Sequence, residues 1–250
     1  MISLEFDGAV ACATLCRPPV NAINDAWIAR LGEALDELEA RSEVRVLRIR
    51  SAERVFCAGA DLALMRERFD TPEGRARMVE FTRALQSVYA RLERSPRVSI
   101  AEIGGAALGG GLELALACDL RLVADSARVG LPEARLGLLP GAGGTQRLTR
   151  ICGDAIARRL ILGAEVIDGA QAAALGLAHH CVPAADLPAR ARELAARLGA
   201  MPGAALAASK RCINAALAQG ADGFEAEVQG TAQLLADPET QRLVREFLSG

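Results

Sequence analysis

Histidine is scarce in this 250-residue sequence: it occurs only at His179 and His180. Adjacent residues of a strand point to opposite faces, so the pair is poorly placed to share a metal ion. No G-x-S-x-G segment is present to provide the nucleophile of a Ser-His-Asp triad. We therefore expect no histidine metal site and no serine triad, and we interpret both histidines as structural or surface residues.

Lysine and aromatic residues are also scarce. Lys210 is the only lysine among 29 basic residues, aromatic residues make up 3% of the chain, and the formal net charge is −2. Non-specific binding to nucleic acid needs a basic surface, and base stacking needs aromatic side chains. We expect no nucleic-acid partner.

Membrane and redox signatures are missing as well. The first residues include Glu5 and Asp7 in place of a basic and then apolar leader, and no uninterrupted 18-residue apolar stretch follows. None of the seven cysteines forms a C-x-x-C pair, which favours buried, reduced thiols. The sequence predicts a soluble cytoplasmic protein without a membrane partner.

What is present is a large apolar content of 51% and an alternation of strand and helix patterns. Asp7-Gly8 indicates a hairpin, and Thr71-Pro72-Glu73 is typical of a helix start. Alternating strands and helices predict an α/β fold with a partly parallel sheet. We expect a mixed core over residues 1–195 and a helical region over 196–250. The predicted helices cover 25–41, 71–94 and 112–118, and the predicted strands cover 44–50, 98–103 and 120–124.

Two glycine-rich segments, Gly104–Gly111 and Gly141–Gly144, do not complete the G-x-G-x-x-G pattern of dinucleotide-binding folds. The first segment precedes an acid, Glu113, that lies among leucine and alanine residues. If a helix starts at these glycines, the free N–H of Gly110 and the Glu113 carboxyl share its first turn. An acid in an apolar setting is costly to bury without a partner, which indicates a functional role.

Four segments carry a resemblance to a known family: 56–62, 104–113, 131–133 and 137–148. They resemble the crotonase superfamily, and within it the enoyl-CoA hydratases that use two glutamates. The resemblance implies an α/β, crotonase-like spiral of β-β-α units with a C-terminal helical region. It also implies assembly into homotrimers or homohexamers, with residues 196–250 as the oligomerisation region.

The resemblance also implies a site. Ala60 and Gly110 match the two oxyanion positions, and Glu113 and Glu133 match both catalytic glutamates, with the family's 20-residue spacing. The implied reaction is hydration of a 2-enoyl-CoA, in which Glu113 activates water and Glu133 delivers a proton. Coenzyme A is part of the substrate, and no metal or other cofactor is expected. The residues implied to contact the acyl-CoA substrate are Arg17, Val20, Ala22, Ala58, Asp61, Leu62 and Gly109.

Other interpretations stay open at this level. An enoyl-CoA isomerase or another crotonase-type reaction shares the oxyanion hole, and a non-catalytic oligomeric RNA- or protein-binding homologue belongs to a different class. Residues 62–69 are expected to line the acyl pocket as loops. Glu102, in a predicted strand, is interpreted as a solvated or ion-paired acid, with a third carboxyl tuning the pocket as the alternative.

Overall fold

The computed structural model describes residues 1–218 and 220–249. A six-stranded sheet has the order β1-β2-β3-β4-β6-β9, and a three-stranded sheet has the order β5-β7-β8. The antiparallel β1-β2 hairpin turns at Gly8, and every other pair in the larger sheet is parallel. The strands are β1 (Ile2–Asp7), β2 (Val10–Leu15), β3 (Val46–Ser51), β4 (Val98–Ile103), β5 (Ala107–Leu108), β6 (Leu120–Ala124), β7 (Arg128–Gly130), β8 (Val166–Asp168) and β9 (His180–Val182).

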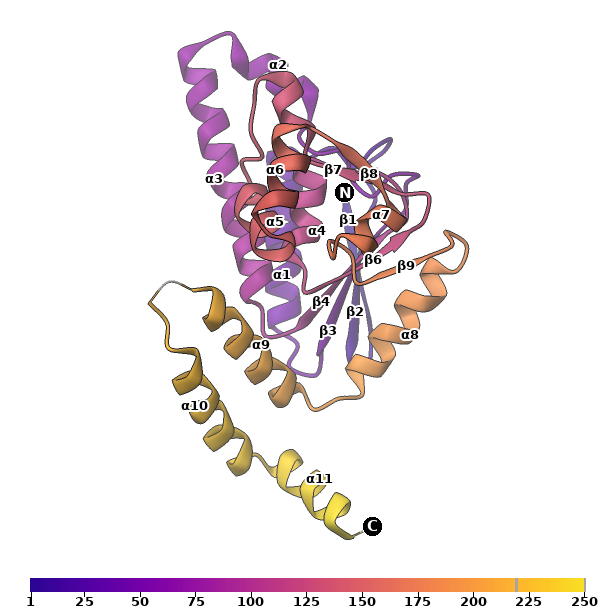
Figure 1. Ribbon diagram of the computed structural model, residues 1–250, viewed down its shortest axis with the longest axis vertical. Coiled ribbons are helices and arrows are strands. Elements are labelled where there is room, and N and C mark those ends of the chain that lie inside the picture. The colour runs from indigo at the N-terminus through magenta and orange to yellow at the C-terminus, as the bar shows by residue number, and fades with distance from the viewer. Residues whose placement is uncertain (219, 250) are drawn as a thin grey trace.

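Helices cover both faces of the larger sheet (Figure 1). On one side pack α1 (Asp25–Glu39), α3 (Pro72–Arg94) and α4 (Gly110–Ala117), and on the other α8 (Leu187–Gly199). Thr71 caps α3 by accepting from the Gly74 N–H, with Pro72 at the first helical position as predicted. The remaining core helices are α2 (Leu62–Phe69), the 3₁₀ helix η1 (Pro132–Leu136), α5 (Gly144–Cys152), α6 (Asp154–Leu162) and α7 (Gly169–Ala174).

The C-terminal helices α9 (Gly203–Leu217), α10 (Gly223–Ala236) and α11 (Pro238–Ser249) extend away from this core (Figure 1). The division expected after residue 195 falls inside α8, which packs on β2, β3, β4 and β6. By its packing, α8 therefore belongs with the sheet as far as Gly199.

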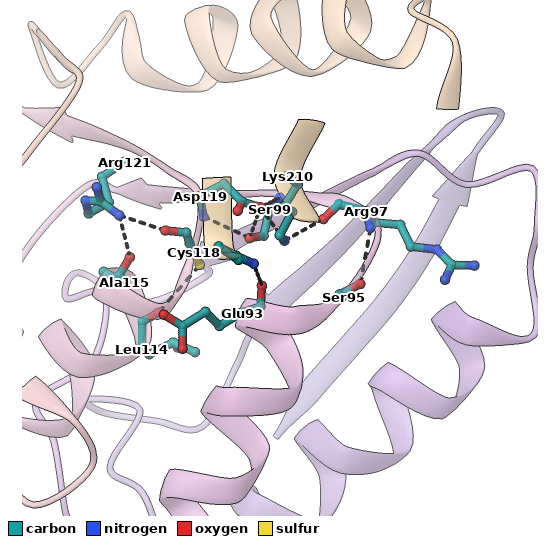
Figure 2. Close-up of polar contacts among 11 residues, drawn as sticks. Glu93, Ser95, Arg97, Ser99, Leu114, Ala115, Cys118, Asp119, Arg121 and Lys210 are labelled. Carbon is teal, nitrogen blue, oxygen red and sulfur yellow. Dashed lines mark hydrogen bonds and ion pairs between the residues drawn. The ribbon is translucent and has the colours of Figure 1, made fainter. Parts of the chain in front are cut away.

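One ion-paired network ties α9 to the sheet and to the end of α4 (Figure 2). Lys210 on α9 donates to Asp119 Oδ2 at 2.7 Å and to the Arg97 carbonyl at 2.9 Å. The same Asp119 oxygen accepts from the backbone N–H and the hydroxyl of Ser99. Arg121 donates to the Cys118 carbonyl at 2.7 Å, which satisfies the C-terminal end of α4.

The buried acid Glu102 forms an ion pair with Arg48, so its interpretation as an ion-paired acid is confirmed. Arg121 on β6 points to the α4 side of the sheet, where it donates to the Cys118 carbonyl. Glu102 pairs with the next residue of β6, Leu122, whose side chain points the other way. The Glu102 and Arg48 side chains therefore lie on the opposite face of the sheet, which α8 covers. Glu102 does not line the active-site cleft described below, which leaves the pocket-tuning alternative without structural support.

The histidine and cysteine predictions hold in part. His179 accepts from the Arg121 N–H through Nδ1, and burial lowers its pKa to about 4, as suits a structural residue. All seven cysteines are free, but only Cys57 and Cys118 are buried and the other five are half-buried. Within the described part of the chain, no helix is both long and apolar enough to cross a membrane.

Candidate active site

A single cleft of about 1060 Å³ gathers the residues that the sequence singled out. Its walls come from α2, α3, the N-terminus of α4, η1 and the loops before them. The segment expected as loops over residues 62–69 is helix α2, which is capped by Asp61 through the Ala63 N–H. The predicted residues on the cleft wall are Arg17, Val20, Ala22, Ala58, Ala60, Asp61, Leu62, Gly109, Gly110, Glu113 and Glu133.

The N-terminus of α4 opens into this cleft. Gly109 precedes the helix with φ +52°, a conformation that glycine adopts without strain, and its carbonyl accepts from the Glu113 N–H at 2.9 Å. Tyr89 on α3 donates its hydroxyl to the Gly110 carbonyl at 2.9 Å, which fixes the first turn. Gly110, as the first residue of the helix, has no intrahelical acceptor for its N–H.

The amide of Ala60 is positioned by a short parallel bridge. Ile23 donates to the Gly59 carbonyl and accepts from the Asp61 N–H, so the N–H of the intervening Ala60 points the other way. A Cβ placed on Gly110 would lie 3.7 Å from Gly59 Cα, so the two segments are in contact. Both residues line the cleft, and their N–H groups have no backbone acceptor in the described residues.

Glu113 is buried, with 2% of its surface exposed, yet it is well hydrogen-bonded. Its Oε1 accepts from the backbone N–H groups of Ala142 and Gly144, both at 2.8 Å. A Cβ on Gly144 would lie 2.9 Å from that oxygen, so glycine is what allows the approach. Burial is the main cause that raises the Glu113 pKa to about 7; the two amides oppose it and the charge of Glu133 adds to it.

Glu133 lies in the first turn of the 3₁₀ helix η1. Its Oε2 is buried and accepts no hydrogen bond from the described residues, and burial raises its pKa. A Cβ on Gly109 would lie 2.8 Å from Glu133 Oε1, so the carboxyl rests against the glycine that starts α4. Two coupled acids thus lie beside the free Gly110 amide.

Arg17 is engaged within the protein. Its guanidinium donates to the Ala22 carbonyl at 2.6 Å and to Asp61 Oδ2 at 2.7 Å, and this arginine lowers the pKa of Asp61. The pair fixes the loop that carries Ala60. Contact of Arg17 with the nucleotide of coenzyme A stays a prediction.

The sequence did not indicate that the amides of Ala142 and Gly144 bind Glu113. The glycine run before α5 is part of the family resemblance, but the sequence does not indicate what its amides contact.

A family model described as enoyl-CoA hydratase/isomerase matches residues 5–248. The chain belongs to this family.

Relatives and solved structures agree with this placement in the crotonase superfamily. A short-chain-enoyl-CoA hydratase from Clostridium acetobutylicum is 37% identical over 234 residues, which cover 92% of this chain and 88% of the relative. Enoyl-CoA hydratase domain-containing protein 2, mitochondrial, from Mus musculus is 48% identical over 163 residues, which cover 65% of this chain and 53% of that protein. This chain thus matches about half the length of the mouse protein.

The fold comparison confirms the predicted α/β, crotonase-like architecture. An enoyl-CoA hydratase structure from Bacillus anthracis superposes with a TM-score of 0.91 at 32% identity, covering 99% of this chain and 96% of that one. Pseudomonas aeruginosa DspI gives a TM-score of 0.92 at 32% identity, covering 99% and 94%. The chain is therefore a crotonase-family enzyme, and the reaction is inferred from its site.

Proposed function

We propose that this enzyme adds water across the 2,3 double bond of a 2-enoyl-CoA thioester to give a 3-hydroxyacyl-CoA. The observation that carries the proposal is the pairing of two acids of raised pKa, Glu113 and Glu133, beside two free backbone amides. A double-bond isomerisation moves one proton and needs one such acid, whereas hydration needs both a base and an acid.

In this proposal the thioester oxygen accepts from the N–H groups of Ala60 and Gly110, which stabilise the enolate as charge develops. Glu113, as carboxylate, takes a proton from water while the water oxygen bonds to C3. Glu133, as carboxylic acid, gives its proton to C2. The proton left on Glu113 returns to Glu133 through solvent, so that one water is consumed in each turnover.

The raised pKa is common to both acids, so the two roles are assigned from their hydrogen bonds. Two amides donate to Glu113 Oε1, and hydrogen bonds from N–H groups favour the ionised form. Glu133 Oε2 is buried without a partner in the described residues, which favours the neutral form. Glu113 is thus suited to act as the base and Glu133 as the acid.

The test is a panel of 2-enoyl-CoA thioesters of different chain lengths, followed by loss of the conjugated absorbance. The wild type is expected to hydrate at least one member, and Glu113→Gln and Glu133→Gln each to lower kcat by about 10²- to 10⁴-fold. Glu193→Gln, on an exposed part of α8, is the matched control. Near-wild-type hydration by either active-site variant would refute the role assigned to that residue.

We propose further that coenzyme A enters only as part of the substrate and that no metal or separate cofactor takes part. Dialysis against a chelator is then expected to leave kcat unchanged, whereas a loss restored by one added metal would contradict this. Cytoplasmic localisation stays a prediction as well.

A further inference from the structure

The glycine run before α5 is followed by Arg147, a buried residue that does not line the cleft. Its guanidinium donates to the Ala142 carbonyl at 2.9 Å through one terminal nitrogen. Through the other terminal nitrogen and Nε it donates to Glu93 Oε2 on α3, at 2.8 and 3.2 Å. Arg147 thus joins the active-site loop to α3.

The hydrogen bond from Arg147 to the Ala142 carbonyl lies in the part of the loop that contacts Glu113. The N–H groups of Ala142 and Gly144 bind Glu113, and the peptide between them contributes the carbonyl that Arg147 holds. Gly143 has φ +103°, and a Cβ there would lie 2.3 Å from the Arg147 guanidinium. The loop therefore wraps closely around the guanidinium, and its two amides face the opposite way.

Further hydrogen bonds hold the active-site loop and the backbone of Glu93. Gln86 on α3 donates to the Gly141 carbonyl at 2.5 Å, which provides a second tether for the loop. Asn214 on α9 donates to the backbone carbonyl of Glu93 at 3.4 Å. Figure 2 shows Glu93 together with the Lys210 network. The Arg147–Glu93 pair therefore joins α5 to α3, with the Arg147 side chain buried and the Glu93 side chain 32% exposed.

We propose that Arg147 is a positioning residue of the hydration reaction: it holds the loop amides of Ala142 and Gly144 against Glu113, so that this acid stays ionised and aimed at the attacking water. The inference rests on the proposed function for the reaction, but the clamp itself is a property of the free enzyme. Arg147 acts through the loop and does not touch substrate.

The charges around Glu113 support this role. Burial and the charge of Glu133 raise its pKa, while the two loop amides and the charge of Arg147 lower it. Tyr89 stays neutral because burial raises its pKa well above the usual value, and burial raises that of Cys57 to about 12. The charged and titratable groups near Glu113 or its immediate partners are Glu133 on η1, Arg147 on α5, Glu93 and Tyr89 on α3, and Cys57 in the loop before α2.

The experiment is a pH titration of Glu113 in the substrate-free enzyme by difference infrared spectroscopy, with its carboxyl band assigned by loss in Glu113→Gln. In Arg147→Met the Glu113 midpoint is expected to rise by about one pH unit. The pH below which kcat/KM falls should rise by the same amount. Arg147→Lys keeps the charge but cannot bridge both partners, so a smaller rise is expected. Arg150→Met, exposed on the same helix, should leave the midpoint unchanged.

An Arg147→Met enzyme that unfolds cooperatively but titrates as the wild type would overturn the proposal. If that variant does not fold, Arg147→Lys decides: an unchanged midpoint together with unchanged kcat/KM overturns it equally. Absence of hydratase activity in the wild type would instead reject the proposed function. In that case the infrared titration still reports on the clamp.

Discussion

At the scale of single residues, the pH profile follows from the surroundings of Glu113 and Glu133. Burial raises the Glu113 pKa to about 7, and the proposed base must be ionised, so kcat/KM is expected to fall about tenfold per pH unit below that value. Burial also raises the Glu133 pKa, and this acid must be protonated, so the rate should fall again at higher pH. Because the acids are coupled, both limbs belong to the pair.

The measurement is kcat/KM for one enoyl-CoA over the range from about pH 5 to pH 10. A profile that stays flat from pH 7 down to pH 5 would contradict an ionised Glu113 as the base.

Two glycines of nearly equal φ separate strain from function. Gly109 has φ +52° and Gly8 has φ +54°, but a Cβ on Gly109 would lie 2.8 Å from Glu133 Oε1, whereas one on Gly8 meets nothing within 4 Å. Gly8→Ala should lose about 1 to 2 kcal/mol of unfolding free energy in urea titrations, and Gly109→Ala at least as much, because its ψ of −126° lies outside the left-handed helical region and its Cβ would meet Glu133. Only Gly109→Ala should lose activity, by at least about tenfold, because it displaces Glu133. Equal activity losses would refute that account.

Part of the candidate site was predictable from residues that are close in sequence, whereas Ala60 and Glu133 came from the family resemblance. Gly110 and Glu113 share the first turn of α4, and a start at the glycines was visible in the pattern. The bonds from Ala142 and Gly144 to Glu113 span 29 and 31 residues, so no local pattern indicates them. They depend on how α5 packs against α4.

At the scale of elements, the helices over 25–41 and 71–94, which have an apolar stripe and a typical start respectively, were predicted to within a few residues. The predicted helix 25–41 is Asp25–Glu39, and the strand 44–50 is Val46–Ser51. Helix α2 was missed because it has a single buried residue, Met65, and so lacks a clear stripe. Packing on α3 and the Asp61 cap stabilise it instead.

The attachment of α9 offers a test of stability. The Lys210 ammonium is buried against Asp119, and removing one partner of a buried pair leaves the other uncompensated. Lys210→Met is expected to lower the unfolding free energy by about 3 kcal/mol in urea titrations. Arg211→Met, at an exposed position next to it, is the control, and similar losses in both variants would contradict the role of the pair.

At the scale of the whole molecule, the expectation of a spiral of β-β-α units came from the family resemblance and not from periodicity. Hydrophobic alternation places Glu102 on one face of β4, but it does not reveal Arg48 as its partner on the next strand, 54 residues away. Such long-range pairings are decided by tertiary packing.

The homotrimer or homohexamer stays a prediction, and it concerns the apolar surface of the C-terminal helices. Phe224 and Phe247 are 84% and 85% exposed, and Val228 is 64% exposed. Side chains of this size on adjoining helices favour burial against other copies of the chain. Light scattering on the protein eluted from a size-exclusion column should give the mass of three or six chains. The double variant Phe224→Ser, Val228→Ser should have a lower mass. A monomeric wild type at micromolar concentration would contradict the prediction.

The most direct test of the paired-acid account is the isotope content of the product formed from a 2-enoyl-CoA in ¹⁸O-labelled heavy water. We predict a 3-hydroxyacyl-CoA that carries one ¹⁸O at C3 and one deuteron at C2, with the rate at which this doubly labelled product forms lowered by about 10²- to 10⁴-fold when Glu113 or Glu133 is replaced by glutamine. Deuterium incorporation without ¹⁸O, as a shift of the double bond would give, would contradict the account.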